Sequence, residues 1–368
     1  MGLFPYGKEN NSIPPILDYH TPFGLSNANV IIPTYPNSAQ VNMHPYPEIN
    51  APWQGPEHDL TTEQSRRDMA YAVQKATQEK ALDYIVSASK LADRKNVVLT
   101  GGYALNCVAN YSFLERLNEE GINLYVEPIS SDAGTAIGAA LWGYHEASRD
   151  EMRRGRDIYL GPKYNYQQSD IDKLVDEFDC QMSDASQSDV VKLITEKNIV
   201  AMFQGRSESG PRALGNRSIL YDPTDPDGKD FVNSVKKREY FRPFAGTILA
   251  EDVHEWFDLR GIEDTPHMMY AVNCQPGVEE KIPSIIHVDG TCRIQTVTEE
   301  ENPNYYNFIK EFKKQTGVPI VFNTSFNLGG EPLVETLQDA FSTLQQSDIE
   351  YLYLPEFGKL LYLGNHIE

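Results

Sequence analysis

Three arginines fall within fourteen residues in the segment GRSESGPRALGNRS, residues 205–218. They are Arg206, Arg212 and Arg217. Guanidinium groups bind phosphate through paired N–H donors, and the Gly-Pro turn at 210–211 can offer backbone N–H groups to the same anion. The segment therefore predicts a phosphate-binding loop.

A second basic segment, VNSVKKREYFRPFA, adds Lys236, Lys237, Arg238 and Arg242, and Glu239 is its only acidic residue. Cations this close together need either carboxylate partners or a polyphosphate. The alternative is a solvated face, or ion pairs with some of the 53 acidic residues of the chain. Glycine, proline and aromatic residues between the charges favour ordered loops, where binding and catalysis concentrate.

Two further stretches place polar side chains at turns. Their residues are His287, Asp289 and Arg293 in HVDGTCR, and Asn323, Thr324 and Ser325 in NTSFNLGGEP. Amides and hydroxyls donate hydrogen bonds well to phosphate or carbamoyl oxygens. Both stretches therefore fit the chemistry of the basic segments.

The first half of the chain offers weaker signals. GGYALN, residues 101–106, follows an apolar run and indicates close approach of the backbone to a nucleotide, with a simple turn as the alternative. Asp132 in SDAGTA precedes an apolar helix, and from residue type alone it is more typical of a helix cap than of a metal ligand.

Composition limits the class of protein. With 368 residues and 40% hydrophobic content, the chain can bury the cores of two domains. Its net charge of −21 argues against a general nucleic-acid binder, which needs a basic face. No apolar stretch reaches membrane-spanning length and no signal peptide is visible, so we expect a cytoplasmic protein without a membrane anchor. The four cysteines, Cys107, Cys180, Cys274 and Cys292, form no CxxC pair and are expected to be reduced.

Hydrophobic periodicity predicts an α/β fold. The first sixty residues are rich in proline and should be mostly irregular. A capping box at Thr61 and Gln64 should open a long amphipathic helix that runs to residue 92. We expect strands at 96–100, 123–128, 199–204, 217–221, 318–323 and 359–364. We expect helices from 104, and at 135–147, 186–197, 228–238, 305–315 and 336–346.

Six blocks follow one another along the chain: GGYALNCVAN, SDAGTAIGAAL, GRSESGPRALGNRSIL, VKKREYFRPFAG, HVDGTCRIQTV and TGVPIVFNTSFNLGGEPLVET. In this order they resemble the NodU/CmcH family of O-carbamoyltransferases, to which the tobramycin and nodulation-factor carbamoyltransferases belong. MGLFPYG is similar to MGLAPYG, which lies inside family members, so the resemblance covers nearly all of this chain. It implies a partial actin-like ATPase domain, residues 1–155, followed by a YrdC-like α/β domain, residues 165–368.

The resemblance also implies a reaction. In the family's scheme, the YrdC-like domain makes carbamoyl-adenylate from ATP and carbamoyl phosphate, and we expect Mg²⁺ to assist. The actin-like domain then passes the carbamoyl group to a hydroxyl of a small molecule, with a bound divalent metal such as Fe²⁺. Fixed cations can stabilise the charge on the phosphate oxygens, and no side-chain nucleophile is required.

By this resemblance each residue receives a role. Those implied in catalysis are Arg212, Lys236, Arg242 and Arg293. Those implied in binding carbamoyl phosphate and ATP are Arg206, Arg217, Arg238, His287, Asn323, Thr324 and Ser325. Gly101, Gly102 and Asn106 would contact the adenylate, and Asp132 would be a metal ligand.

The start of the chain departs from the family. Family members carry an N-terminal stretch with a metal-binding HxxxH pair, and none of the eight histidines here lies at that spacing. We therefore expect the C-terminal part of a split or truncated enzyme, with the other lobe on a separate chain. Two alternatives stay open: a nucleotide-binding remnant without turnover, and threonylcarbamoyl-adenylate chemistry on tRNA.

Overall fold

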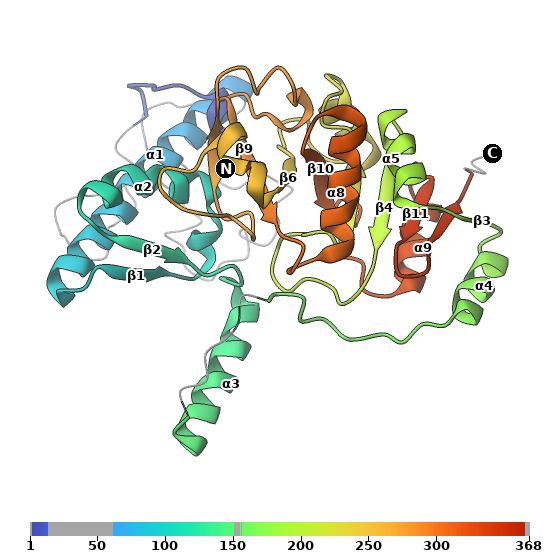
Figure 1. Cartoon of the computed structure of the whole chain (residues 1–368). Helices are drawn as coiled ribbons and strands as arrows, with labels where there is room; N and C mark the ends of the chain where they lie inside the picture. The colour runs from blue at the N-terminus through green and yellow to red at the C-terminus, as the bar shows by residue number, and fades with distance from the viewer. Residues whose placement is uncertain (1, 14–61, 151–154, 156, 365–368) are drawn as a thin grey trace, which may run out of the picture. The chain divides into compact units, whose positions relative to one another are not determined.

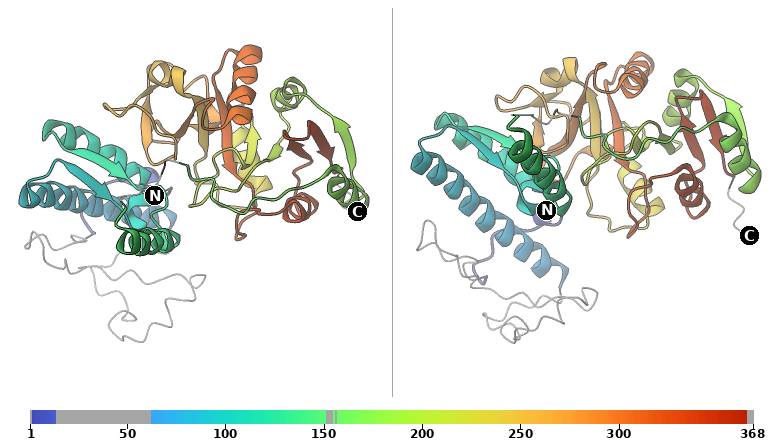
Figure 2. Two further views of the ribbon diagram at one scale, coloured as in Figure 1. Left: turned by 60° about the horizontal axis from the view of Figure 1, so that its bottom comes forward. Right: turned by 90° about the horizontal axis from the view of Figure 1, so that it is seen from below.

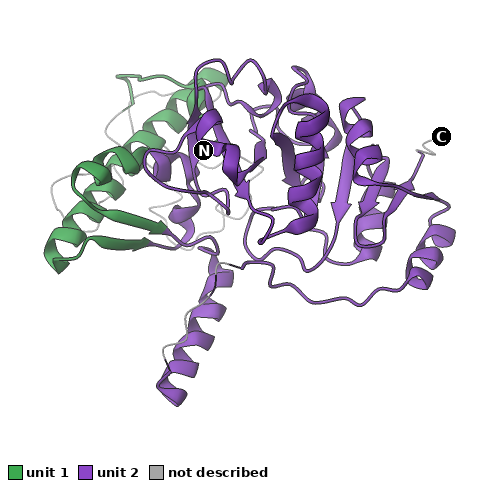
Figure 3. Cartoon of the chain, in the orientation of Figure 1, with its two compact units in different colours: residues 1–98, 112–125 green, residues 99–111, 126–368 purple. Residues whose placement is uncertain are grey.

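Two units make up the chain (Figure 3). The computed structural model describes residues 2–13, 62–150, 155 and 157–364. Contacts between residues group 1–98 with 112–125, and 99–111 with 126–368. The boundary between the two units passes through helix α2, Cys107–Glu119, near Tyr111. It therefore lies elsewhere than the predicted domain limits.

The first unit is built on the long helix α1, Glu63–Ala92. Thr62 caps it, since its hydroxyl oxygen accepts the N–H of Ser65 at 3.2 Å. The predicted cap residue, Thr61, lies outside the described residues, as do residues 14–60 of the predicted irregular region. The unit also holds the short helix η1, Phe4–Tyr6, and most of a two-stranded sheet formed by β1, Asn96–Leu99, and β2, Asn123–Val126.

Asp68 ties the N-terminal segment to α1. Its carboxylate accepts hydrogen bonds from the backbone N–H of Lys8, from the side chain of Asn10 and from the side chain of Gln64, at 3.1, 3.1 and 2.7 Å. These bonds outweigh the effect of burial and lower the pKa of Asp68. The segment around MGLFPYG is therefore an ordered part of the first unit.

A mixed sheet forms the centre of the second unit. Within the described residues its strand order is β3-β12-β11-β4-β5-β10-β6-β9-β8-β7, with β11/β4 and β6/β9 parallel. The strands are β3 Gln181–Asp184, β4 Val200–Phe203, β5 Arg217–Tyr221, β6 Ala245–Leu249, β7 Phe257–Asp258, β8 Ala271–Cys274, β9 Thr291–Val297, β10 Ile320–Ser325, β11 Tyr351–Leu354 and β12 Lys359–Tyr362. Figure 2 shows the red strands β11 and β12 beside green β3 at one end of the sheet.

Helices make up much of the rest of the second unit. They are η3 Gly102–Leu105, α3 Asp132–Ser148, α4 Gln168–Glu177, α5 Gln187–Thr195, α6 Gly228–Val235, η4 Ala250–Asp252, α7 Val253–Trp256, η5 Pro283–Ile285, α8 Pro303–Thr316 and α9 Leu337–Gln345. Helix α8 packs on β6 and β10, and α5 packs on α8, β4 and β5, so both cover the same face (Figure 1). On α8 the buried residues Tyr305, Phe308, Ile309 and Phe312 recur at helical spacing. No described helix has the length and apolar content that a bilayer span needs.

The α/β prediction is confirmed. Strand β5 has the predicted bounds, and the helices predicted at 186–197, 305–315 and 336–346 are present as α5, α8 and α9. Strands β3, β6, β7, β8, β9 and β11 were not predicted. In β9, TCRIQTV, polar residues interrupt the apolar pattern although most of the strand is buried, so hydrophobicity alone does not reveal it.

Gly215 tests the packing at the centre of this unit. Its φ is +110°, and a Cβ there would lie 2.2 Å from the ring of Tyr305. We expect Gly215→Ala to lower the free energy of unfolding by about 2–4 kcal/mol in urea denaturation, through overpacking and backbone strain. Gly277→Ala is the control, because it shares a positive φ but has open space around its Cβ. Equal losses in both variants would contradict the packing.

Candidate anion-binding site

Four basic side chains from three segments gather in the second unit. We call Arg212, Lys236, Arg238 and Arg293 the cation cluster. Arg212 and Arg293 lie close enough to repel each other, as do Arg238 and Arg293, and Arg238 and Lys236. Burial, with this repulsion, lowers the pKa of Arg212 and of Arg238 to about 10. Both guanidinium groups stay charged at neutral pH.

The cluster lacks the partners that cations usually have. Among the described residues, no carboxylate forms an ion pair with any of its members. Buried nitrogens without a hydrogen-bond partner there include Nε of Arg212, Nη2 of Arg238 and Nε of Arg293. Buried donors without acceptors are costly, so the cluster is suited to an anion that brings several oxygens.

Arg242 borders the cluster. It repels Arg238, but its Nε donates to Glu239 Oε2 at 2.7 Å and its side chain is half exposed. An exposed pair of this kind is weak, so an anion can draw Arg242 away from Glu239 at little cost.

Lys236 is the most buried member of the cluster. Its ammonium donates to the backbone carbonyls of Ser325 and Asn327, the latter at 2.8 Å, and to Asn327 Oδ1 at 3.2 Å. Burial, with repulsion from Arg238, lowers the pKa of Lys236 to about 7. Lys236 therefore ties the turn after β10 to α6 and changes charge near neutral pH.

Strand register sets the relation between Asn323 and Arg293. Asn323 on β10 lies beside Ala245 on β6, and Ala245 lies beside Arg293 on β9. The amide of Asn323 donates to the carbonyl of Ala213 at 3.2 Å and to Thr247 Oγ1 at 3.0 Å. This amide therefore fixes the backbone next to Arg212 onto the sheet.

Two buried opposite charges fold the loop that carries Arg212. Oε1 of Glu208 accepts the N–H groups of Leu214, Asn216 and Arg217 at 2.7, 2.8 and 3.3 Å. The Arg217 guanidinium, with no exposed surface, donates to the carbonyls of Gln204, Gly205, Asn216 and Glu335 and lies 3.6 Å from the ring centroid of Phe203. Burial raises the pKa of Glu208, and its N–H donors and Arg217 oppose this.

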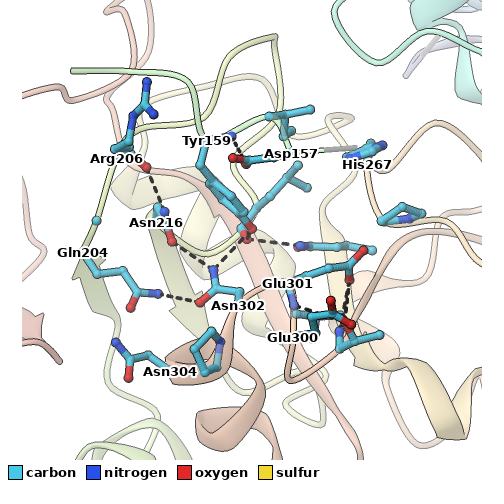
Figure 4. Close-up of a pocket in the computed structure, with 18 of the residues that line it drawn as sticks. Asp157, Tyr159, Gln204, Arg206, Asn216, His267, Glu300, Glu301, Asn302 and Asn304 are labelled. Carbon is cyan, nitrogen blue, oxygen red and sulfur yellow. Dashed lines mark hydrogen bonds between the residues drawn. The ribbon is translucent and has the colours of Figure 1, made fainter. Parts of the chain in front are cut away.

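A polar cavity of about 860 Å³ lies on the other flank of this loop (Figure 4). At its centre the amide of Asn302 donates to Asn216 Oδ1 at 2.9 Å and accepts from Gln204 at 3.4 Å. Arg206 also lines the cavity, but its guanidinium donates to the carbonyls of Gly161 and Leu160 at 2.6 and 2.9 Å. The polar groups of the cavity floor bond to one another and so hold the loop in place.

The structure thus brings some predicted site residues together and not others. Arg212, Lys236, Arg238, Arg242 and Arg293 form one group, with Asn323 and Ser325 beside it. Arg206 and Arg217 hold backbone carbonyls instead. Thr324 alternates with Asn323 and Ser325 along β10, so its side chain points to the opposite face. Buried His287 lies 3.4 Å from Asp289 across a glycine turn.

The predicted nucleotide segment in the first half of the chain meets Arg212. Gly102 begins η3, Gly101 precedes it with φ +86°, and Asn106 Oδ1 accepts the N–H of Ala109 at the start of α2. Arg212 Nη2 donates to the carbonyl of Leu105 at 3.1 Å. The segment and the cation cluster therefore belong to one unit.

Asp132 lies at the first turn of α3. Ser131 is the residue before the helix, so Asp132 is its first residue and not its cap. The described residues contain no group of three or more His, Cys, Asp or Glu side chains arranged to hold a metal. All four cysteines are free thiols.

Three side chains that hold the site in place were not predicted from the sequence. Glu208 is the only acid between Arg206 and Arg217, and its isolation in a basic loop was a usable signal. Asn233 and Gln295, both buried, carry no such signal, because an amide in a helix or strand is usually exposed.

Comparisons with known proteins show the family of this chain. The family model described as "Carbamoyltransferase N-terminus" matches residues 38–141, and "Carbamoyltransferase C-terminus" matches residues 191–359. The chain belongs to the carbamoyltransferase family. The C-terminal match spans every member of the cation cluster, and the N-terminal match spans the segment that Arg212 contacts.

Relatives of this chain align with most of its length. It is 37% identical to "Nodulation protein NolO" of Bradyrhizobium diazoefficiens over 302 residues, 80% of this chain and 54% of that protein. It is 34% identical to "Uncharacterized protein sll1178" of Synechocystis sp. over 393 residues, 97% of this chain and 62% of that protein. The chain thus spans about half the length of the curated relatives it matches. A solved structure of full-length HypF, in a phosphate- and nucleotide-bound form, aligns at 18% identity over 46% of this chain and 21% of HypF with a TM-score of 0.33, too low to support an argument.

Glu208 should contribute more to the free energy of unfolding than an exposed carboxylate does. Glu208→Ala removes the larger of two carboxylate charges that favour buried Arg217, the other being Glu335, and leaves three N–H groups without an acceptor. We therefore expect a loss of about 3–5 kcal/mol in urea unfolding. Glu208→Gln should lose less, because an amide oxygen still accepts. Glu356→Ala is the control, since exposed Glu356 also accepts a loop N–H, that of Gly205 at 3.0 Å. Similar losses in Glu208→Ala and Glu356→Ala would contradict this role.

Lys236 should make anion affinity depend on pH. Because an anion favours the charged amine, binding takes up a proton once the pH exceeds the pKa of about 7 in the free protein. We expect sulfate, which stays divalent, to bind more weakly as pH rises from 7 to 9, by up to about tenfold per unit. Lys236→Arg should flatten this dependence, because arginine stays charged. Isothermal titration calorimetry measures the sulfate affinity of the parent chain and of Lys236→Arg at each pH. If affinity fell equally with pH in the two proteins, Lys236 would be excluded as the titrating group.

Proposed function

We propose that this chain makes carbamoyl-adenylate from ATP and carbamoyl phosphate at the cation cluster, as one part of an O-carbamoyltransferase. The observation that carries the proposal is the cluster itself: four basic side chains, three of them arginines with a buried N–H donor left over, and no described carboxylate at ion-pair distance from any of them. Both substrates are phosphate esters or anhydrides, and their oxygens match these donors. Membership of the carbamoyltransferase family supports the choice of a carbamoyl donor.

The reaction needs the two substrates held in position and the negative charge on the leaving pyrophosphate stabilised. Carbamoyl phosphate gives carbamate and phosphate with one water, and a carbamate oxygen then attacks the α-phosphorus of ATP. The bond from that phosphorus to the bridging oxygen breaks, and pyrophosphate leaves with the electron pair. Negative charge grows on pyrophosphate, where Arg212, Arg238 and Arg293 can neutralise it. Lys236 stabilises the same charge when protonated.

Transfer follows in this proposal. A hydroxyl oxygen of a small-molecule acceptor attacks the carbamoyl carbon, AMP leaves, and the hydroxyl proton passes to a base. Gly101, Gly102 and Asn106 would contact the adenylate, and the Arg212–Leu105 contact supports a short path from the cluster to this segment. We also propose the actin-like and YrdC-like arrangement over residues 1–155 and 165–368, and a cytoplasmic location.

A divalent metal such as Fe²⁺ would assist transfer, with Asp132 as one of its ligands. This assignment stays a prediction, because the described residues contain no group of three or more His, Cys, Asp or Glu side chains arranged to hold a metal. ATP itself would arrive with Mg²⁺. A separate N-terminal lobe as partner also stays a prediction.

Adenylation can be tested by exchange of labelled pyrophosphate into ATP, dependent on carbamoyl phosphate. We expect the full chain to catalyse it, and Arg212→Ala or Arg293→Ala to lose about 2–4 kcal/mol of transition-state stabilisation, roughly 30- to 900-fold in rate. Arg242→Ala should lose less, because Arg242 is half exposed and paired. Arg116→Ala, on the surface of α2, is the control.

The same assay separates the alternatives. A nucleotide-binding remnant would bind ATP without exchange, and threonylcarbamoyl-adenylate chemistry would require threonine and bicarbonate in place of carbamoyl phosphate. Parental exchange rates in both Arg212→Ala and Arg293→Ala would remove the cluster from the reaction.

A further inference from the structure

An exposed aromatic residue follows the basic residues of the cation cluster closely in the sequence. Tyr240 lies in the connection between α6 and β6 and is 48% exposed. It is two residues from Arg238 and two from Arg242, and two residues of chain span at most about 7 Å. Tyr240 therefore lies on the same short backbone segment as Arg238 of the cluster and Arg242, which borders it.

This segment is held in one conformation. The buried amide of Asn233 donates to the carbonyls of Tyr240 and Arg242 at 3.4 and 3.3 Å, and its oxygen accepts Nε of Arg238 at 2.7 Å. The N–H of Arg242 also donates to the carbonyl of Glu239 at 3.1 Å. One amide thus fixes the backbone at Tyr240 and the guanidinium of Arg238 together.

The ring itself is also supported. Phe241 packs against it edge to face, with centroids 5.6 Å apart and planes at 86°. Arg238 in turn stacks 4.1 Å from the ring centroid of Phe244. An exposed ring that packs against Phe241 and lies on the same segment as basic side chains offers a flat surface. Nucleobases stack on aromatic side chains of this kind.

We propose that Tyr240 is the stacking platform for the base of a nucleoside triphosphate whose phosphates occupy the cation cluster. The inference rests on the proposed function, because it takes the cluster to bind polyphosphate. Stacking uses the face that every base has, so it adds affinity without choosing strongly between adenine and guanine. Binding of the bare phosphate chain does not involve the ring.

Two probes separate the ring from the cations: ATP and inorganic tripolyphosphate, titrated calorimetrically into the full chain. Tyr240→Ala weakens ATP by roughly 5- to 100-fold, the range of one base–aromatic stack, and leaves tripolyphosphate unchanged. Tyr240→Phe keeps both affinities, because the ring remains. Tyr144→Ala on α3 is the matched control, since Tyr144 is also exposed, at 41%, and should change neither affinity.

Each other outcome overturns the inference. Unchanged ATP affinity in Tyr240→Ala excludes stacking on this ring. Equal weakening of ATP and tripolyphosphate means that Tyr240 acts through the arginines on its loop. A parent chain that binds tripolyphosphate as tightly as ATP keeps the anion site but removes any base platform. A parent chain that binds neither overturns the proposed function together with this inference.

Discussion

Glu208 and Arg217 are buried opposite charges that hold one loop from both sides of its backbone. Oε1 of Glu208 accepts N–H groups at the end of the loop, and Arg217 donates to carbonyls at both ends, so hydrogen bonds compensate most of each buried charge. Glu208 Oε2 and Arg217 Nε are buried without a partner. A buried pair of this kind need not add stability over an apolar pair, but breaking it is costly. The pair therefore specifies one conformation for residues 204–217, and Arg212 projects from that conformation.

The cation cluster depends on this loop and on the sheet beneath it. Asn323 attaches the loop to β10, the register of β6 and β9 brings Arg293 level with Asn323, and Lys236 ties α6 to the turn after β10. Burying these cations, and to a lesser extent gathering them, costs free energy, as the lowered pKa values of Arg212, Lys236 and Arg238 indicate. A bound polyanion would offset part of that cost.

The residue types in the sequence predicted a cluster of basic side chains. They did not show which arginine of the segment 205–218 belongs to it. Arg206, Arg212 and Arg217 stand in one basic segment, yet only Arg212 reaches the cluster, because Arg217 begins a fully buried strand and Arg206 binds the carbonyls of Leu160 and Gly161. Sequence spacing does not fix the direction of a loop side chain. Strand β9 was missed because the hydrogen bonds of Gln295 and Thr247 let polar side chains lie in the core, against the usual pattern.

A crystal structure of the full chain grown with pyrophosphate would show whether the cation cluster binds a polyphosphate. We expect pyrophosphate oxygens within hydrogen-bond distance of Arg212, Arg238 and Arg293, with the loop of residues 204–217 unchanged because Glu208 and Arg217 already hold it. Pyrophosphate bound elsewhere, or a loop that refolds so that Arg217 leaves its carbonyls to reach the anion, would contradict this expectation.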